Sequence, residues 1–218
     1  MIIKRIKLEN YTVFEDHQIE FDPGINIFIG ENGTGKTHLF KVLYSACQCV
    51  DQRVSFSHKL VSTMLPDDYK ISRLITRKQG NRSALIRIFA GERDVTQERV
   101  LSASFHGKTK KWDAEVMGEK GWDEPESNIN PSYISIIVEL LFELQRKGVQ
   151  VFVSTHDYMI ASYFEVRKAK NDSIAFHSLS HVGKTCDLIY EKKEKFADLK
   201  NNAIVSAFDK LLDEIYDL

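Results

Sequence analysis

The spacing of apolar and polar residues along the chain predicts a mixed α/β fold. Residues 2–8 alternate between apolar and charged side chains closely enough to predict a strand, and residues 18–21 predict a second strand before the turn at Pro23-Gly24. Residues 26–29, Asn-Ile-Phe-Ile, form a short apolar run that leads into a glycine-rich loop and a segment of helical spacing. The chain therefore opens with a hairpin followed by a strand, a loop and a helix.

The rest of the chain predicts an antiparallel lobe and then a return to alternating helices and strands. Between residues 50 and 82 the sequence is mixed and polar, and Pro66-Asp67 predicts a loop. The meander of the lobe is predicted at residues 83–90, 100–105 and 112–116. The later elements are predicted as a helix from Asn130-Pro131 to Lys147-Gly148, a buried strand at 149–154, a short helix from Asp157, a hairpin around 181–184 and a last helix with an apolar stripe from Phe196 to Ile215.

Length and composition are those of an ordinary globular chain. The 218 residues allow one domain, or one domain and a small lobe, and 43% hydrophobic with 28% charged residues excludes a disordered or collagen-like chain. Lys and Arg total 30 against 31 Asp and Glu, so that any contact with nucleic acid must come from a local basic patch. We expect neither a secretion signal nor a membrane span, because no apolar run approaches ~20 residues.

Three cysteines, Cys47, Cys49 and Cys186, form neither a Cys-x-x-Cys pair nor a spaced zinc-ligand quartet. This pattern favours a reduced, cytoplasmic setting. We interpret Cys47 and Cys49 as packing residues of the first helix. His177 and His181 lie four residues apart in a segment that predicts a strand, where this spacing separates the two rings too widely to favour a metal site.

Residues 30–37, Gly-Glu-Asn-Gly-Thr-Gly-Lys-Thr, match the complete phosphate-binding pattern G-x-x-x-x-G-K-[ST] between a predicted strand and a predicted helix. Glycines allow successive backbone N–H groups to point at phosphate oxygens, and the helix N-terminus adds positive potential. Lys36 is expected to reach the β- and γ-phosphates, and Thr37 is expected to bind Mg²⁺. The pattern predicts a nucleoside triphosphate as the ligand.

Two further groups of polar residues follow this loop in the chain. Asp123 and Glu124 are adjacent carboxylates, which suit a division of labour between magnesium binding through water and polarisation of the attacking water. His156 follows the predicted strand 149–154, where it can approach the γ-phosphate. Alone, the acidic pair is also typical of a solvated turn and His156 of a capping residue. Their order after the loop favours the functional interpretation.

The segments GENGTGKT, DEPESNINP and STHD resemble the Walker A motif, the Walker B motif with its D-loop, and the H-loop of ABC-type ATPases. The resemblance is to the SMC, RecF and OLD-like branch, often named AAA-family ATPases, and it covers residues 1 to about 50 and 123 to about 190. It implies an α/β P-loop head with a mostly parallel core sheet, helices on both faces and an antiparallel β lobe. The single head would comprise an N-terminal lobe at 1–117 and a C-terminal lobe at 122–218.

The resemblance also implies ATP and Mg²⁺ as cofactors and a role for each motif residue. The implied magnesium ligands are Thr37 and Asp123, and the D-loop is placed at residues 127–130. The implied catalytic residues are Lys36, Glu124 as the base and His156 as the γ-phosphate sensor. The implied nucleotide-binding residues are Gly30, Glu31, Asn32, Gly33, Thr34, Gly35, Lys36, Thr37 and His38.

The sequence departs from the family pattern at two points. Residues 116–122 are not the apolar strand that precedes the Walker B aspartate in this branch, and no Ser-Gly-Gly signature motif occurs between Lys41 and Trp122. We hypothesise a deletion, a linker or an omitted segment near residues 117–122; a natural, minimal head is the alternative. Without the signature serine from a partner head, hydrolysis is expected to be slow even where ATP binds.

Two interpretations of function stay open at this point. The first is an ATP-hydrolysing head that dimerises on ATP, or pairs with another ATPase head, and serves DNA repair, chromosome maintenance or antiphage defence. The second is a nucleotide-gated module that docks an effector protein or nucleic acid with little turnover. A GTPase is disfavoured because no Asn-Lys-x-Asp motif follows the loop. Basic stretches such as residues 73–82 and 108–111 are interpreted as solvated surface rather than a DNA contact, and no membrane partner is expected.

Overall fold

The computed structural model describes residues 2–49, 55–78, 80, 83–92, 98–107, 134–181 and 187–216. The chain divides into two compact units. One comprises Met1–Phe21 and Thr37–Gly121, and the other comprises Asp22–Lys36 and Trp122–Leu218. The phosphate-binding loop is thus part of the second unit, whereas the helix that follows it extends into the first.

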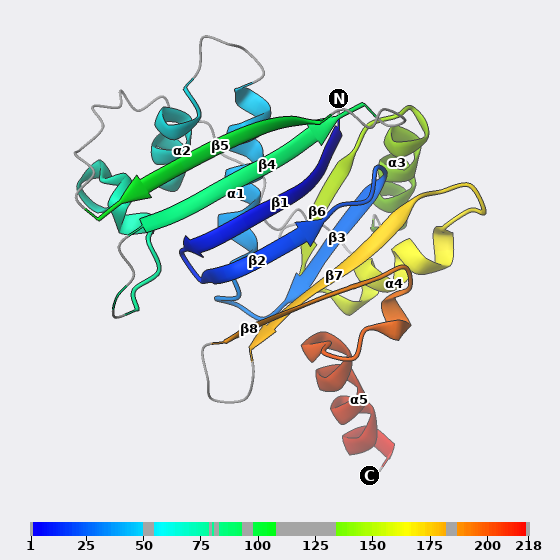
Figure 1. Cartoon of the computed structure of the whole chain (residues 1–218). Coiled ribbons are helices and arrows are strands. Elements are labelled where there is room, and N and C mark those ends of the chain that lie inside the picture. The colour runs from blue at the N-terminus through cyan, green and yellow to red at the C-terminus, as the bar shows by residue number, and fades with distance from the viewer. Residues whose placement is uncertain are drawn as a thin grey trace. The chain divides into compact units, whose positions relative to one another are not determined.

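The first unit contains a four-stranded antiparallel sheet in the order β2-β1-β4-β5 (Figure 1). Its strands are β1 (Ile2–Tyr11), β2 (Phe14–Glu20), β4 (Ser83–Gly91) and β5 (Arg99–His106). Ile6 and Leu8 of β1 are fully buried and pair with the buried Ile88 and Ile86 of β4, whereas Lys7 and Arg87 pair on the opposite face. This alternation confirms the predicted opening hairpin and antiparallel lobe.

The first unit also contains two α-helices, α1 (Lys36–Gln48), from Thr37 onward, and α2 (Phe56–Met64). The sequence interpretation missed α2, because its short apolar set of Phe56, Leu60 and Val61 stands within a polar stretch. Short 3-10 turns follow at Asp67–Tyr69 and Ile71–Leu74. The predicted strand at residues 112–116 and the hypothesised junction at 117–122 lie outside the described residues.

The second unit contains a four-stranded, mostly parallel sheet in the order β6-β3-β7-β8. Its strands are β3 (Ile25–Gly30), β6 (Val151–Thr155), β7 (Ile174–His181) and β8 (Leu188–Lys193). β6, β3 and β7 run parallel, and β8 returns antiparallel to β7. The predicted α/β class with a mostly parallel core sheet is confirmed. The antiparallel pairing of β7 and β8 agrees with the hairpin predicted around residues 181–184, whose turn at 182–186 lies outside the described residues.

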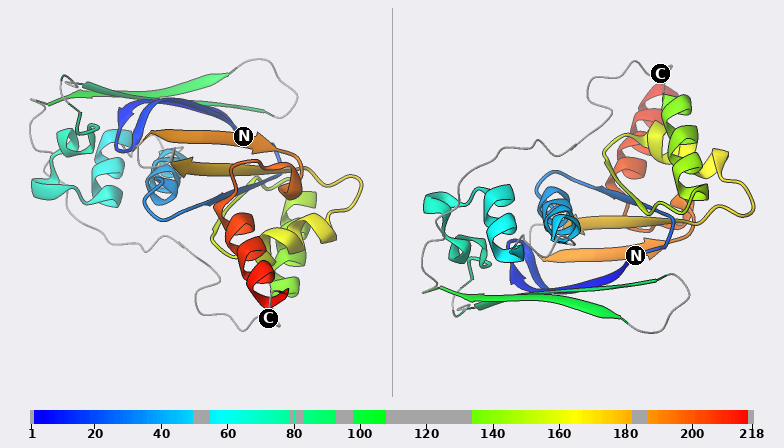
Figure 2. Two further views of the ribbon diagram at one scale, coloured as in Figure 1. Left: turned by 90° about the horizontal axis from the view of Figure 1, so that it is seen from below. Right: turned by 90° about the horizontal axis from the view of Figure 1, so that it is seen from above.

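Three helices of this unit pack together on one face of the sheet (Figure 2). They are α3 (Ile134–Arg146), α4 (Tyr158–Arg167) and α5 (Ala203–Tyr216). The core beneath them takes alternate residues of the strands and the inner faces of the helices: Ile25, Ile27, Ile29, Val138, Phe142, Val153, Ile160, Phe164, Ile174 and Phe176. None of the helices described is long and apolar enough to cross a membrane.

The predicted start of the last helix at Phe196 is wrong. Phe196 lies in a 3-10 turn, Phe196–Asp198, and the α-helix begins at Ala203. Asn202 sets this start, because its Oδ1 accepts hydrogen bonds from the backbone N–H groups of Ile204 (3.2 Å) and Val205 (3.3 Å). The apolar stripe runs through both the 3-10 turn and α5, because Phe196 is buried in the core of the second unit and Ile204 and Val205 pack against that core.

Candidate nucleotide-binding site

The glycine-rich loop joins the end of β3 to the start of α1, as predicted. Gly30 ends the strand, and a Cβ atom at this position would lie 2.0 Å from the carbonyl oxygen of Leu179 on β7. Gly33 and Gly35 adopt φ angles of +84° and +91°, which side chains with a Cβ rarely tolerate. Close strand packing and left-handed backbone therefore require glycine at these three positions.

Lys36 is folded back into this loop. Its Nζ donates hydrogen bonds to the carbonyl oxygens of Gly30 (2.7 Å) and Glu31 (2.8 Å), and the residue is only 5% exposed. The hydroxyl of Thr34 also donates to the carbonyl oxygen of Glu31, at 2.8 Å. These bonds hold a buried positive charge within a turn of backbone that leads into a helix N-terminus, which is the arrangement that attracts phosphate groups.

The rim of the loop is open to solvent. Glu31, Asn32 and Gly33 are exposed, and so is Thr37 in the first turn of α1. His38 is partly buried, and its Nδ1 has no hydrogen-bond partner among the described residues. Burial, followed by the charge of Lys41, lowers the pKa of His38, so that its ring is neutral at physiological pH.

His156 reaches the same loop from the neighbouring strand. β3 and β6 are parallel and in register at Ile29 and Thr155, so the residues that follow both strands meet at one edge of the sheet. Nδ1 of His156 lies 2.9 Å from the carbonyl oxygen of Gly30. A carbonyl oxygen only accepts, and therefore Nδ1 carries the proton. The predicted juxtaposition of His156 with the loop is thus present in the structure.

The residues on either side of His156 fix its position. The hydroxyl of Thr155 accepts a hydrogen bond from the backbone N–H of Asp157 (3.0 Å). The Asp157 carboxylate caps α4 by accepting bonds from the N–H groups of Met159 (2.6 Å) and Ile160 (3.3 Å). Asp157, rather than His156, is therefore the capping residue that the sequence left open.

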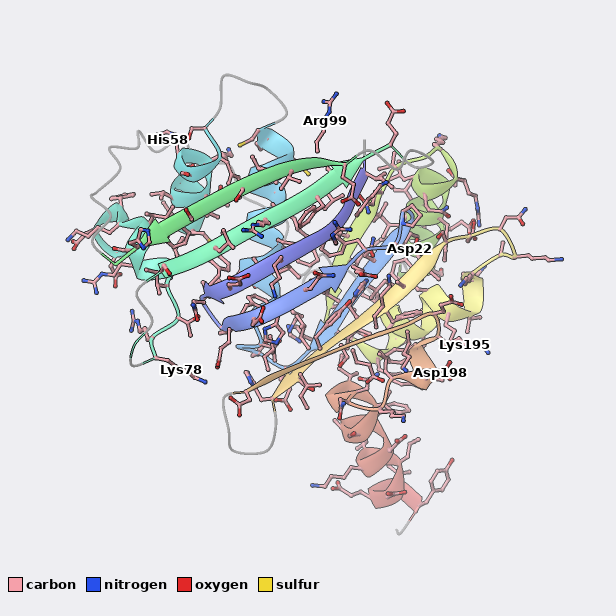
Figure 3. The ribbon with its side chains drawn as sticks, in the orientation of Figure 1. Asp22, His58, Lys78, Arg99, Lys195 and Asp198 are labelled. Atoms are coloured by element: carbon pink, nitrogen blue, oxygen red, sulfur yellow. The ribbon has the colours of Figure 1, made fainter. Side chains whose placement is uncertain are left out.

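A buried polar network lies behind the loop, and the sequence interpretation missed it. Asn26, treated above as part of an apolar run, is fully buried; its Oδ1 accepts from Asp22 N (2.7 Å) and its Nδ2 donates to Asp22 O (2.8 Å). Asp22, labelled in Figure 3, also accepts at Oδ1 from Gly24 N (2.7 Å) and from the Ser173 hydroxyl (2.5 Å). The network ties the start of β3 to the segment before β7.

His177 extends this network across the sheet. Its Nε2 lies 3.0 Å from Asn26 Oδ1 and its Nδ1 lies 2.9 Å from the Tyr190 hydroxyl, while its ring stacks on Phe28 with centroids 4.4 Å apart. Because Asn26 Oδ1 is an acceptor, Nε2 carries the proton and Tyr190 donates to Nδ1. Burial, followed by the charge of Lys192, lowers the pKa of His177 to about 3. His177 is a neutral structural residue.

The remaining site predictions are not tested by the structure. Asp123, Glu124 and the D-loop residues 127–130 lie outside the described residues. In the described part of the chain, no group of three or more His, Cys, Asp or Glu side chains could hold a metal ion. The interpretation of Cys47 as a packing residue is wrong, because its side chain is exposed, whereas Cys49 is partly buried; partial desolvation by neighbouring atoms nevertheless raises the pKa of both thiols, which disfavours a reactive thiolate.

Comparison with known proteins agrees with this geometry. A family model described as AAA domain matches residues 5–217, nearly the whole chain. The chain belongs to this AAA domain family. Two solved structures share its fold, a SmcHead bound to the C-winged helix domain of ScpA (TM-score 0.61, 9% identity, 91% of this chain, 100% of that one) and the SMC head domain from Thermotoga maritima (TM-score 0.51, 10% identity, 89% and 100%).

Curated relatives match shorter stretches of the AAA domain chain. The DNA replication and repair protein RecF of Streptococcus agalactiae serotype Ia is 34% identical over 88 residues, 40% of this chain and 24% of RecF. RecF of Phocaeicola vulgatus is 47% identical over 49 residues, 22% of this chain and 13% of RecF. The matched part is thus about a quarter or less of each relative. Family and fold together show an AAA domain with the fold of SMC heads, part of which is similar to RecF.

Proposed function

We propose that this AAA domain chain binds ATP with Mg²⁺ at the loop of residues 30–37 and hydrolyses it as an ABC-type ATPase head. The observation that carries the proposal is the carbonyl oxygen of Gly30, which accepts from both Lys36 Nζ (2.7 Å) and His156 Nδ1 (2.9 Å). Two residues 120 positions apart in the chain thereby share one anchor at the mouth of the phosphate loop. This arrangement preorganises positive charge before a ligand arrives.

The donor set fits ATP with Mg²⁺. Magnesium in nucleotide sites takes one or two protein oxygens together with phosphate oxygens and water. The hydroxyl of Thr37, exposed at the start of α1, is the proposed first protein ligand. Asp123 is the proposed second ligand, through water. The bound ion would neutralise charge that develops on the transferred phosphoryl group.

Each residue of the site then has a chemical task. Lys36 neutralises phosphate charge from a fixed position, and the N-terminus of α1 adds the potential of its unpaired N–H groups. Glu124 is the proposed base that orients and polarises water for in-line attack on the γ-phosphate. His156, held by Gly30, is the proposed sensor that distinguishes a bound triphosphate from a diphosphate.

The process served is proposed from the relatives. Matches to RecF, a DNA replication and repair protein, favour DNA repair or maintenance over antiphage defence. We further propose that two heads, two copies of this chain or one copy with a partner head, close on ATP and open on hydrolysis, and that the closed pair engages nucleic acid or an effector protein.

A second candidate function is a nucleotide-gated binding module with little turnover. It is favoured by the sequence itself, which lacks a Ser-Gly-Gly signature and an apolar strand before Asp123. ATP would then act as a ligand that switches docking on, and its slow loss would switch docking off.

Steady-state ATP turnover of the wild type and of Glu124→Gln separates the two functions. An enzyme loses about 10²–10⁴-fold in rate when its general base is removed, whereas Glu214→Gln, at an exposed position of α5, serves as the control and retains the rate. ATP binding with no measurable turnover in any of the three proteins would support the module. Turnover that survives Glu124→Gln unchanged would contradict the assignment of the base.

A further inference from the structure

Helix α3 is apolar around most of its circumference. Ile134, Val138 and Phe142 are buried against the sheet. A second apolar row, Ile136, Leu140 and Leu144, repeats at i, i+4 and i+8, and its side chains are 62%, 55% and 36% exposed. A helix of a globular protein normally exposes its polar side, and apolar residues on two sides are typical of a helix covered on both.

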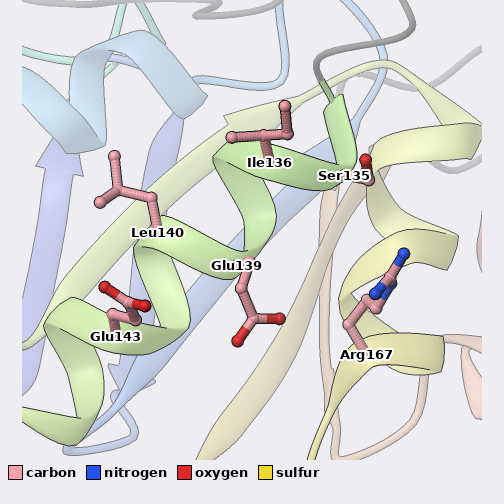
Figure 4. A pocket seen from close by; sticks show the side chains of 6 residues that line it. All are labelled: Ser135, Ile136, Glu139, Leu140, Glu143 and Arg167. Atoms are coloured by element: carbon pink, nitrogen blue, oxygen red, sulfur yellow. The ribbon is translucent and has the colours of Figure 1, made fainter.

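Ile136 and Leu140 of this outer row line a groove of about 440 Å³, and Leu144 lies one turn further along the same side of the helix. Figure 4 shows the six lining side chains, five of them from α3 and one, Arg167, from α4. The apolar surface continues past the end of the helix at Val149, which is 46% exposed and whose backbone N–H donates to Leu144 O (3.1 Å). A continuous apolar stripe with a polar rim marks a binding surface, unlike scattered exposed residues.

The rim on α3 is acidic. Glu139 and Glu143 lie one turn apart beside the apolar row; Glu143 is exposed and Glu139 is partly exposed. Arg146, the basic residue of the last turn of α3, is already engaged by Glu139 (2.9 Å) and by both oxygens of Asp172 (2.9 and 2.8 Å). Glu143 makes no ion pair with any described residue. The α3 side of the groove therefore offers carboxylate charge that a partner can neutralise.

We propose that this groove docks an amphipathic helix of a partner protein, whose apolar residues pack on Ile136, Leu140 and Leu144 and whose lysine or arginine side chains pair with Glu143. The matching i, i+4 spacing of the apolar and acidic rows suits a helix laid along α3. A second copy of the same face is the alternative occupant, which the light-scattering measurement below tests. The inference is independent of the nucleotide site.

Two labelled peptides test the proposal on the intact chain by fluorescence anisotropy. One is an 18-residue helical peptide of leucine and lysine, with leucine at i, i+3 and i+4 spacing, and the other has glutamate at every lysine position. We expect the lysine peptide to bind the wild type at least tenfold more tightly than the glutamate peptide. Glu143→Lys should reduce this ratio at least tenfold, because the attraction of the lysine peptide becomes a repulsion and the repulsion of the glutamate peptide becomes an attraction.

Leu140→Asp should weaken binding of the lysine peptide at least tenfold, and Leu211→Asp serves as its matched control. Leu211 on α5 is 51% exposed, close to the 55% of Leu140, and its change should leave the affinity unaltered. Equal losses in the two aspartate variants would overturn the proposal, since they would show unspecific apolar binding. Absence of binding by both peptides would also overturn it, and would assign the face to another segment of the chain or, if light scattering shows a dimer, to a second copy.

Discussion

Replacing His177 by glutamine tests whether the buried network behind the loop holds a neutral imidazole. In the folded protein His177 is completely buried between Asn26 and Tyr190, and its pKa is lowered to about 3 from the ordinary value of 6.5. Between these two values the unfolded chain binds a proton that the folded chain does not. Stability from this residue is therefore complete above pH 6.5 and is lost as the pH falls toward 3.

The size of this loss follows from the two pKa values. Between pH 7 and pH 5 the free energy of protonating the unfolded histidine changes by about 2 kcal/mol, whereas the folded protein takes up almost no proton. The wild type should therefore lose about 2 kcal/mol of unfolding free energy in this interval through His177 alone. At pH 7, His177→Gln should be less stable by roughly 1–3 kcal/mol, because a buried bond to Tyr190 and the stack on Phe28 are lost.

Urea denaturation at pH 7 and pH 5 measures both the loss of wild-type stability with pH and the cost of the substitution. The stability gap between wild type and His177→Gln should shrink by about 2 kcal/mol at pH 5, since only the wild type carries the titrating group. A gap for His177→Gln that stays constant between the two pH values would refute the neutral, buried assignment.

Three further changes test the local structure of the site and of its unit. Gly30→Ala should cost about 2–3 kcal/mol in urea denaturation, because its Cβ would meet the Leu179 carbonyl oxygen at 2.0 Å; unchanged stability would contradict the tight β3–β7 packing. Asp157→Ala should lower the unfolding free energy by about 1 kcal/mol while Asp157→Asn retains most of it, as measured by thermal unfolding; equal effects would exclude a capping role. Arg146→Ala should lower the unfolding free energy at pH 7, because Asp172 loses the Arg146 hydrogen bond that chiefly lowers the pKa of its carboxyl group; the loss should fade as the pH falls through the pKa of Asp172, and a loss that persists there would contradict the pairing.

Sequence patterns that span only a few residues were enough to predict much of the fold. The strand, loop and helix around residues 30–37 followed from one complete motif, and period-two alternation in residues 2–8 placed β1 correctly. These features depend on neighbours within a few residues, which a sequence displays directly. The same reasoning missed helix α2. Only Phe56, Leu60 and Val61 of its nine residues are buried, and three apolar positions are too few to reveal a helical period in the sequence.

The hydrogen-bond network around Asn26 could not be predicted from the sequence, because its members are distant in the chain. Asn26 and His177 are 151 residues apart and meet only because β3 and β7 pair in parallel, in the register that sets Phe28 beside His177. The polar residue within the run of residues 26–29 was the one available signal, since a buried amide must find partners. His156 was predicted beside the loop because its strand and motif order were visible, although the accepting atom, the carbonyl oxygen of Gly30, was not.

Equilibrium binding of ATP in the presence of Mg²⁺, measured by calorimetry for the wild type and Lys36→Ala, tests the central claim most directly. Lys36 is the buried ammonium that the loop holds with two carbonyl oxygens. The account predicts saturable binding by the wild type and none by Lys36→Ala, with both proteins folded by circular dichroism. Equal ATP affinity in the two proteins, or no ATP binding by the folded wild type, would contradict the assignment of residues 30–37 as a nucleotide site.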